Sequence, residues 1–236
     1  MRSSINESAC FSTIVFGIVG GIGAGKSFTT AAFVAQGAER FDADQEATRL
    51  YEVPSVIEDV KKRWPKVVDS SSNVNRQALA KIVFAPTAEG RLELARLNEL
   101  IRPRLLEVFS RWLAQKKEEG REFVVLDAPL LFEAGWESFV DYVVFVDASE
   151  ETRLRRVIRR GWSPDEFKRR ESCQLSPEIK KEKADFVVSA EQDDSHMVEQ
   201  VARILCKVRS SDQVRIVRSI VENEACKDAE CQSTNQ

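Results

Sequence analysis

A run of glycines that ends in lysine and serine is the most distinctive chemical pattern in this sequence. Residues 20–27 read GGIGAGKS, which matches the phosphate-binding pattern G-x-x-x-x-G-K-[ST]. Glycines let backbone N–H groups close on phosphate oxygens, and a helix that begins near Gly25 would turn its positive dipole end toward the same anion. Lys26 would then reach the β- and γ-phosphates, and the Ser27 hydroxyl would bind Mg²⁺. The predicted nucleotide-binding residues are Gly21, Ile22, Gly23, Ala24, Gly25, Lys26, Ser27 and Phe28.

The residues on either side distinguish this pattern from a chance glycine-rich turn. Mostly apolar, β-prone residues over 14–19 come directly before the glycines, and residues 26–36 can form a helix that ends at Gly37. A buried strand followed by a helix is the context that the motif requires. The pattern therefore predicts a nucleotide-binding P-loop, although a P-loop alone does not name a reaction.

Three aspartates are candidates for the chemistry beside this loop. Asp42 and Asp44 follow a short predicted strand, and Asp127 lies near the end of a very apolar run over residues 122–128. Ligands of open parallel sheets bind at the carboxyl ends of the strands, where all three aspartates would lie. Asp127 would hold the water shell of Mg²⁺. Asp44 also precedes a helical run that starts at Gln45, so the sequence allows either a functional role or a capping role for it.

The apolar pattern also predicts the elements that position these groups. Buried strands are expected over residues 14–19, 38–41, 122–128, 141–146 and 185–189, and a last core helix over residues 197–208. Residues 54–120 show helical periodicity and no convincing strand, and Pro103 is expected to break their long amphipathic stretch. A helical insertion over about residues 45–120 would therefore stand over the P-loop edge as a substrate lobe.

Composition limits the classes of protein to which the chain can belong. With 236 residues, 43% of them hydrophobic, it is long enough for one α/β domain with insertions, expected over residues 14–208. A net charge of -3 gives no global basic field for nucleic acid, and no apolar run approaches a membrane span. Residues 1–13 form a polar N-terminal extension without the apolar core of a signal peptide, and residues 209–236 form a polar tail. We expect a cytoplasmic protein.

Cysteine and histidine usage excludes several kinds of site. The five cysteines have irregular spacing and form no C-x-x-C pair, which disfavours a disulfide framework or a zinc site. The single histidine, His196, argues against both Ser-His-Asp catalysis and a multi-histidine metal site.

Arginines gather on one predicted helix, which starts at Glu150 and ends at Gly161. A charged segment from Ser163 to Lys183 follows, and it opens with the helix-start sequence Ser-Pro-Asp-Glu. A solvated helix face is one explanation and an RNA-binding stripe is another, but few aromatic residues are interleaved. A phosphate-clamping lid over about residues 161–180 explains the arginines more economically. The arginines of the helix are Arg153, Arg155, Arg156, Arg159 and Arg160.

Together these motifs resemble those of the dephospho-coenzyme A kinases. The resemblance covers roughly residues 14–205. Other nucleoside and nucleotide kinases share the P-loop but not the combination of DAD with PLLFE. The motifs that carry the resemblance are GIVGGIGAGKS at residues 17–27, DAD at 42–44, NRQAL at 75–79, APLLFE at 128–133, RG at 160–161 and KAD at 183–185.

The resemblance implies an α/β fold of the P-loop kinase type, with a five-stranded parallel sheet, a helical CoA-binding insertion and a lid. It also implies transfer of the γ-phosphoryl group of ATP, with Mg²⁺, to the ribose 3′-hydroxyl of dephospho-CoA, the last step of coenzyme A synthesis. The implied catalytic residues are Lys26, Asp44 as the base, and Arg160. The implied acceptor-binding residues are Asp42, Asp44, Arg76, Pro129 and Leu130, and the implied metal ligands are Ser27 and Asp127.

Three residues depart from the usual pattern of that family. Phe28 replaces a threonine whose hydroxyl would touch the α-phosphate, Val19 replaces another threonine, and Arg102 replaces the histidine of a His-Pro pair. None of these changes removes Lys26 or Asp44, so activity is still expected.

Two other functions fit part of the pattern. A related nucleoside or nucleotide kinase could act on another hydroxyl or phosphate group. A non-catalytic P-loop switch is the alternative from a different class, but guanine-specific switches normally carry an Asn-Lys-x-Asp element, which the sequence lacks. The sequence does not indicate an oligomeric state.

Overall fold

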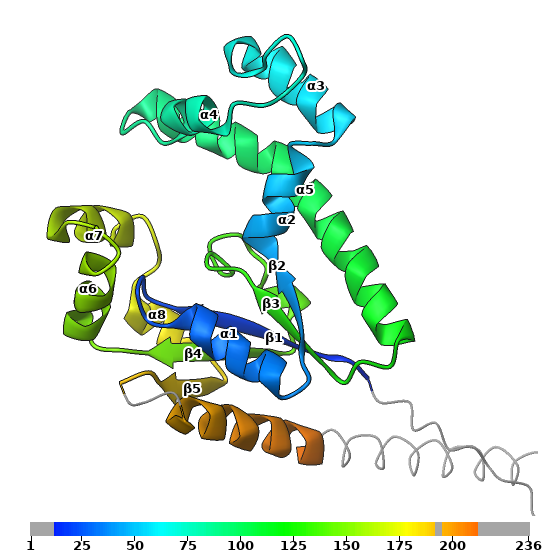
Figure 1. The fold of residues 1–236 in the computed structure, drawn as a ribbon, viewed down its shortest axis with the longest axis vertical. Helices are drawn as coiled ribbons and strands as arrows, with labels where there is room; N and C mark the ends of the chain where they lie inside the picture. Colours follow the sequence, from blue (N-terminus) through cyan, green and yellow to red (C-terminus); the bar gives the residue numbers. More distant parts are fainter. Residues whose placement is uncertain (1–11, 192–194, 212–236) are drawn as a thin grey trace, which may run out of the picture.

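A computed structural model of the chain describes residues 12–191 and 195–211, and its centre is a sheet of five parallel strands (Figure 1). The strand order is β2-β3-β1-β4-β5, which places the strand before the P-loop in the middle. This arrangement confirms the predicted five-stranded parallel sheet. The strands are β1 (Ile14–Gly20), β2 (Glu39–Asp42), β3 (Phe123–Asp127), β4 (Tyr142–Asp147) and β5 (Phe186–Ser189).

Apolar side chains cover both faces of this sheet. Every residue of β1 and β3 is buried, as expected for parallel strands packed between helices. On one face, Phe16 contacts Phe33 of α1 (Lys26–Ala35), with ring centroids 5.0 Å apart, and the helix over residues 195–211 completes that core. On the other face, Phe41 packs against Phe109 of α5 (Ala88–Glu118), again at 5.0 Å. These two cores hold the carboxyl edge of the sheet in place.

The predicted helical insertion is present as a lobe above that edge (Figure 1). Residues 54–120, all of which the structure describes, contain no strand beyond the bridge pair Val68 and Val74. The lobe consists of α2 (Ala43–Leu50), α3 (Pro54–Arg63), the short 3₁₀ helix η1 (Pro65–Val67), α4 (Arg76–Val83) and α5.

The expected break at Pro103 is wrong, because α5 runs through it as one helix of 31 residues. Proline removes one backbone donor and crowds the preceding turn, which usually bends a helix. Next to the proline, the Arg104 guanidinium donates to the Leu100 carbonyl at 2.7 Å. Figure 1 shows α5 changing direction near its middle. Burial of one helix face keeps the two halves continuous, through Leu97, Ile101, Leu105 and Phe109.

The arginine-rich segment folds as three short helices between β4 and β5. They are α6 (Glu150–Ile158), α7 (Pro164–Glu171) and α8 (Pro177–Glu182), and a 3₁₀ turn, η2 (Glu137–Phe139), lies before β4. Serine side chains cap all three helices, and Ser163 accepts from the Glu166 N–H at 3.1 Å, as the helix-start sequence predicted. The predicted last helix extends over residues 195–211. The predicted terminal extensions fall largely outside the described residues.

Candidate nucleotide and acceptor site

The P-loop joins β1 to α1 at the carboxyl edge of the sheet. Its backbone is left-handed at Gly23 (φ 76°) and Gly25 (φ 109°), a conformation that favours glycine. At Gly23 a Cβ atom would also lie 2.7 Å from the Arg153 carbonyl oxygen, so the packing requires glycine as well. Helix α1 begins after Gly25 with no side-chain cap and no acidic residue in its first turn. Its dipole and N–H groups therefore face the loop, where Ser27 and Phe28 are exposed.

Lys26 lies against this loop, where its ammonium group can bind an anion. Its Nζ donates to the carbonyl oxygens of Gly20 and Gly21, both at 2.9 Å. The pKa of Lys26 is lowered to about 8, first by burial and then by the charge of Lys180, while the charge of Asp127 acts in the opposite direction. A phosphate beside the ammonium would raise this pKa again, because a nearby negative charge favours the charged form.

Two of the predicted aspartates end neighbouring strands and share one arginine. Asp42 in β2 and Asp127 in β3 are partners in the register of the sheet. Arg40 donates from Nη2 to Oδ2 of each carboxylate at 2.7 Å. Arg40 was not singled out from the sequence, although the pattern Arg-x-Asp could have placed Arg40 and Asp42 on one side of β2, since side chains alternate along a strand. The contact with Asp127 was not predicted, because it depends on the pairing of strands that are distant in the sequence.

Asp42, and not Asp44, caps helix α2. The helix begins at Ala43, and Oδ1 of Asp42 accepts from the Gln45 N–H at 2.9 Å. The capping role that the sequence allowed for Asp44 is therefore wrong, because the helix starts two residues earlier than the expected start at Gln45. Asp44 lies in the first turn, and its carboxylate is not needed for the cap.

The surroundings of Asp44 favour a carboxyl group that can accept a proton. Although the residue lies at the surface, partial burial of its carboxyl group raises its pKa. Repulsion from Asp42 and Asp127 raises it further, and Lys26 acts in the opposite direction. Asp44 thus interacts electrostatically with both the P-loop lysine and the carboxylates at the ends of β2 and β3. The structure brings together Lys26, Asp42, Asp44 and Asp127, as the sequence predicted.

The residues at this edge fit a Mg²⁺ ion that arrives with a nucleotide. Within the described residues, no group of three or more His, Cys, Asp or Glu side chains could hold a metal ion alone. Mg²⁺ commonly keeps several waters and uses one or two protein oxygens plus substrate phosphates. The exposed Ser27 at the loop and Asp127, with a side chain 10% exposed, can supply such oxygens. These oxygen ligands therefore fit a Mg²⁺ ion that binds as a complex with the nucleotide.

Two arginines of α6 contact the P-loop, and neither is Arg160, the catalytic arginine that the family resemblance implied. Arg156 donates from Nη1 to the Ala24 carbonyl at 2.8 Å and from Nη2 to the Ala190 carbonyl at 2.6 Å. Arg153 is buried against the loop and pairs with Glu171 of α7. Arg160 lies beyond the end of α6 and is exposed. Its catalytic role stays a prediction.

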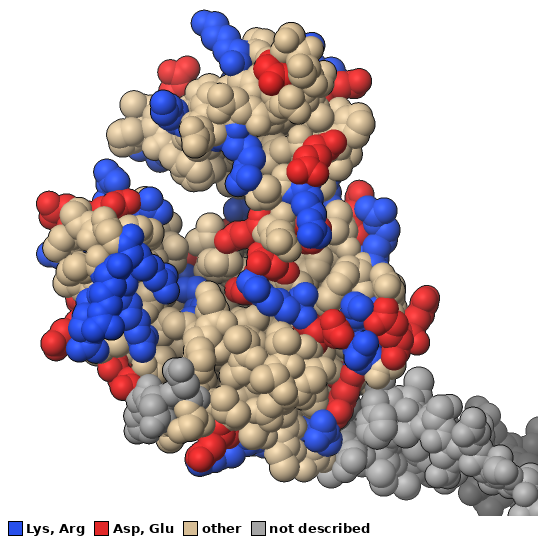
Figure 2. Space-filling view, viewed as in Figure 1, with Lys and Arg blue, Asp and Glu red and all other residues tan. Residues whose placement is uncertain are grey.

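The predicted acceptor residues lie on two sides of the same edge. Pro129 and the exposed Leu130 come shortly after Asp127, the last residue of β3. Arg76 is the first residue of α4 in the helical lobe, and its charge acts on Tyr51 at the end of α2. Figure 2 shows a cleft between the helical lobe and the segment of α6 and α7. This cleft leaves room for an extended acceptor.

A buried ion pair behind the P-loop was not predicted. Lys180 of α8, only 1% exposed, pairs with Glu133 at 2.9 Å. Glu133 also accepts from the Leu175 N–H at 2.9 Å, which ties the predicted lid segment to the loop after β3. The residue belongs to the PLLFE motif, but its partner is 47 residues away and only the fold brings them together.

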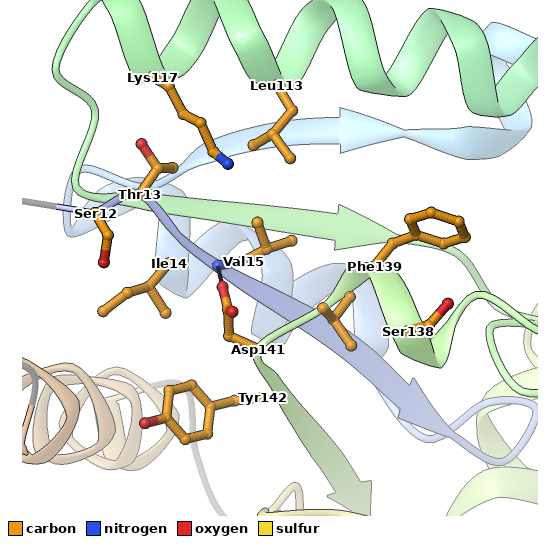
Figure 3. Close-up of a pocket in the computed structure, with 11 residues that line it drawn as sticks. Ser12, Thr13, Ile14, Val15, Leu113, Lys117, Ser138, Phe139, Asp141 and Tyr142 are labelled. Atoms are coloured by element: carbon orange, nitrogen blue, oxygen red, sulfur yellow. Dashed lines mark hydrogen bonds between the residues drawn. The ribbon is translucent and has the colours of Figure 1, made fainter.

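A second hollow lies at the opposite edge of the sheet, where β1 and β4 begin (Figure 3). Asp141 accepts there from the Val15 N–H at 2.8 Å and joins the starts of the two strands. Ligands of parallel sheets bind at the carboxyl ends of the strands, so this hollow is not the candidate site.

Fold and site together define a P-loop phosphotransferase. A central parallel strand leads into the glycine-rich loop, a lysine and carboxylates meet at the same edge, and a helical lobe and an arginine-rich segment flank the cleft. No helix among the described residues is long and apolar enough to cross a membrane.

Comparison with known proteins identifies the family. Residues 14–195 match the family model for dephospho-CoA kinase. The dephospho-CoA kinase of Chlorobaculum tepidum is 34% identical over 181 residues, which cover 74% of this chain and 85% of that protein. The chain therefore belongs to the dephospho-CoA kinase family.

Solved structures share the fold of this chain. The chain is similar to TT1252 from Thermus thermophilus, with a TM-score of 0.73 and 30% identity over 83% of this chain and 97% of the other. The dephospho-CoA kinase from Campylobacter jejuni has the same fold, with a TM-score of 0.62 and 21% identity over 84% of this chain and 98% of the other.

Proposed function

We propose that the protein transfers the γ-phosphoryl group of ATP to the ribose 3′-hydroxyl of dephospho-CoA, giving coenzyme A and ADP. This is the last step of coenzyme A synthesis, and we infer that it takes place in the cytoplasm. The observation that carries the proposal is the electrostatic interaction of Lys26 with Asp44 at the carboxyl edge of the sheet, in a chain of this family. The Lys26 ammonium can bind the transferred phosphate, and the Asp44 carboxylate can bind the attacking hydroxyl.

The nucleotide side of the reaction is assigned to the P-loop. Backbone N–H groups of the loop and the start of α1 would bind phosphate oxygens, and the Lys26 ammonium would stabilise charge on the transferring group. Ser27 and Asp127 would hold Mg²⁺ and its waters, and the ion would neutralise negative charge on the phosphates. Arg153 and Arg156 lie close enough to the loop to add positive charge on the lid side.

The acceptor side is assigned to the aspartates and the helical lobe. Asp44 would accept the proton of the ribose hydroxyl and direct its lone pair at the phosphorus. Asp42 is fixed by its cap and by Arg40, so it would support the position of Asp44. Arg76, Pro129 and Leu130 would bind the remainder of dephospho-CoA in the cleft of Figure 2.

One coupled assay tests this function. ADP release is measured with ATP, Mg²⁺ and dephospho-CoA, and in parallel with AMP or pantetheine as the acceptor. We expect turnover with dephospho-CoA and little with the other two acceptors. A clear preference for AMP would instead identify a nucleotide kinase, and nucleotide binding without turnover on any acceptor would indicate a switch.

A further inference from the structure

Arg153 is a buried cation held between the P-loop and the lid segment. The residue is 6% exposed, and a Cβ atom built on Gly21 would lie 2.6 Å from its Nη1. The same Nη1 lies 3.5 Å from the Ile22 carbonyl oxygen. On its other side the guanidinium lies over the Phe167 ring of α7, 5.4 Å from the ring centroid. The guanidinium is therefore adjacent to the phosphate-binding loop while packed against α7.

The charge of Arg153 is compensated from the lid segment and not from the loop. Glu171, at the end of α7, forms the ion pair with Nη1. The buried Nε of Arg153 has no hydrogen-bond partner in the part of the chain that the structure describes. An arginine carries five N–H donors, so this guanidinium can bind a further acceptor. A phosphate on the P-loop would be the nearest strong acceptor.

We propose that Glu171 and the phosphates of a bound nucleotide compete for Arg153, so that the Arg153–Glu171 pair is a latch that nucleotide binding opens. The inference rests on the proposed binding of nucleotide at the P-loop. When phosphate is bound, the guanidinium turns from Glu171 to phosphate oxygens. Arg153 thereby becomes a phosphate-binding residue, and Glu171 sets how readily it is released.

The direction of this exchange follows from charge. Arginine binds phosphate through charge-assisted hydrogen bonds, often two in parallel, and a phosphate carries more negative charge than one carboxylate. Leaving a buried guanidinium without a partner is costly, so Arg153 pairs with Glu171 until phosphate is present. A protein whose binding-competent form is only partly populated binds its ligand correspondingly more weakly. The latch therefore lowers nucleotide affinity.

Release of Arg153 also changes the attachment of α7. The ion pair and the ring contact with Phe167 join α7 to α6, and Phe167 itself is fully buried. Once Glu171 loses its partner, the buried Phe167 still holds the first part of α7. The last residue of α7, Glu171, is then free to move. The lid position thus depends on whether the P-loop carries phosphate.

Calorimetric titration with ADP and with a non-hydrolysable ATP analogue tests the latch. Glu171→Gln keeps the shape but removes the charge, so we expect nucleotide to bind at least about fivefold more tightly. Glu166→Gln is the matched control, because Glu166 lies on the same helix and pairs with Arg170 away from the loop. Affinity should not change in that control. Unchanged or weaker binding by Glu171→Gln would overturn the proposal.

A double-mutant cycle separates a latch from a purely structural pair. The thermal stability of Arg153→Met, Glu171→Gln and the double variant is measured with and without saturating ADP. We expect a coupling between the two positions in the free protein that disappears with ADP. Coupling that persists with ADP would show that the pair does not open. If Glu171→Gln does not fold, Glu171→Asp, whose shorter side chain weakens the pair, is used and should show a smaller gain in affinity.

These measurements do not depend on the acceptor. If the protein binds ADP but does not phosphorylate dephospho-CoA, the proposed function fails while the latch can still be supported or overturned. If it phosphorylates dephospho-CoA and Glu171→Gln behaves as the wild type, only the latch fails.

Discussion

Arg40 donates from both Nε and Nη2 to a single oxygen, Oδ2 of Asp127, at 3.1 and 2.7 Å. This is the carboxylate that we assign to the metal, so a side chain of the protein already neutralises it. A cation and an arginine that share one carboxylate oxygen compete for it. If Asp127 holds the metal as we propose, Arg40 should weaken the attraction of the site for Mg²⁺.

Replacing Arg40 by Met should lower the Mg²⁺ concentration that gives half-maximal activity, because Asp127 then lacks its competing cation. Binding of Mn²⁺ in the presence of ADP, followed by electron paramagnetic resonance, checks the same effect without turnover. Arg121→Met is the control, since Arg121 pairs with Glu39 at the far end of β2. A higher metal requirement in Arg40→Met would mean that Arg40 orients Asp127 for the metal.

Lys26→Ala should abolish phosphoryl transfer and leave the fold intact. The ammonium meets the charge that is spread over the transferring group, and the other nearby lysine, Lys180, is paired with Glu133. Circular dichroism and thermal melting check the fold, and the coupled assay checks the activity. Near-normal turnover in this variant would contradict the assignment of the P-loop as the nucleotide site.

The same lysine should make the stability of the nucleotide-free protein depend on pH. The pKa of Lys26 is about 8 in the folded state and 10.5 in its ordinary state, so the unfolded chain binds more protons between these values. Stability therefore rises with pH across this window. Below about pH 8, the buried charge costs roughly 1–3 kcal/mol.

Lys26→Met removes that cost, so this variant should be more stable than the wild type at pH 7. The advantage should shrink as the pH approaches 10. Urea denaturation of both proteins at several pH values measures it. A difference that does not change with pH would show that Lys26 is not the titrating group.

Much of the site could be predicted because its residues lie in local patterns. The P-loop spacing fixed the positions of Lys26 and Ser27, and apolar runs placed Asp127 at the end of a central strand. In contrast, the partners of Arg40 and Lys180 come from register and from tertiary packing, which local patterns do not contain. The continuity of α5 through Pro103 was missed for a related reason, because tertiary packing buries one face of α5 on both sides of the proline and outweighs its local preference.

Replacement by lysine can distinguish the roles of Arg156 and Arg160. Arg156→Lys should weaken the binding of nucleotide when no acceptor is present. One ammonium cannot reproduce the two donations that hold Arg156 at the P-loop, from Nη1 to the Ala24 carbonyl and from Nη2 to the Ala190 carbonyl. Arg160 is exposed in this structure, so Arg160→Lys should leave nucleotide affinity unchanged and lower kcat only if lid closure carries it to the phosphates. Binding titrations and steady-state kinetics on both variants distinguish the two effects. Unchanged kcat in Arg160→Lys would assign that role to another arginine.

Asp44→Asn should lower kcat by about two orders of magnitude or more and leave ATP affinity nearly unchanged. The carboxylate is an acceptor for the hydroxyl proton, and base catalysis of this kind contributes roughly 10²–10⁴ in rate. A loose transition state demands little early deprotonation, so part of the loss would come from poorer orientation of the hydroxyl.

Asp42→Asn serves as the comparison for Asp44→Asn, because Asp42 caps α2 and pairs with Arg40. Asparagine also caps helices well, so the cap should survive and the ion pair should be lost. If Asp44 is the base, its replacement should cost far more kcat than that of Asp42, while thermal melting changes little in Asp44→Asn. If Asp44→Asn keeps kcat within a few-fold and raises only the KM for dephospho-CoA, Asp44 binds the acceptor and another group takes the proton.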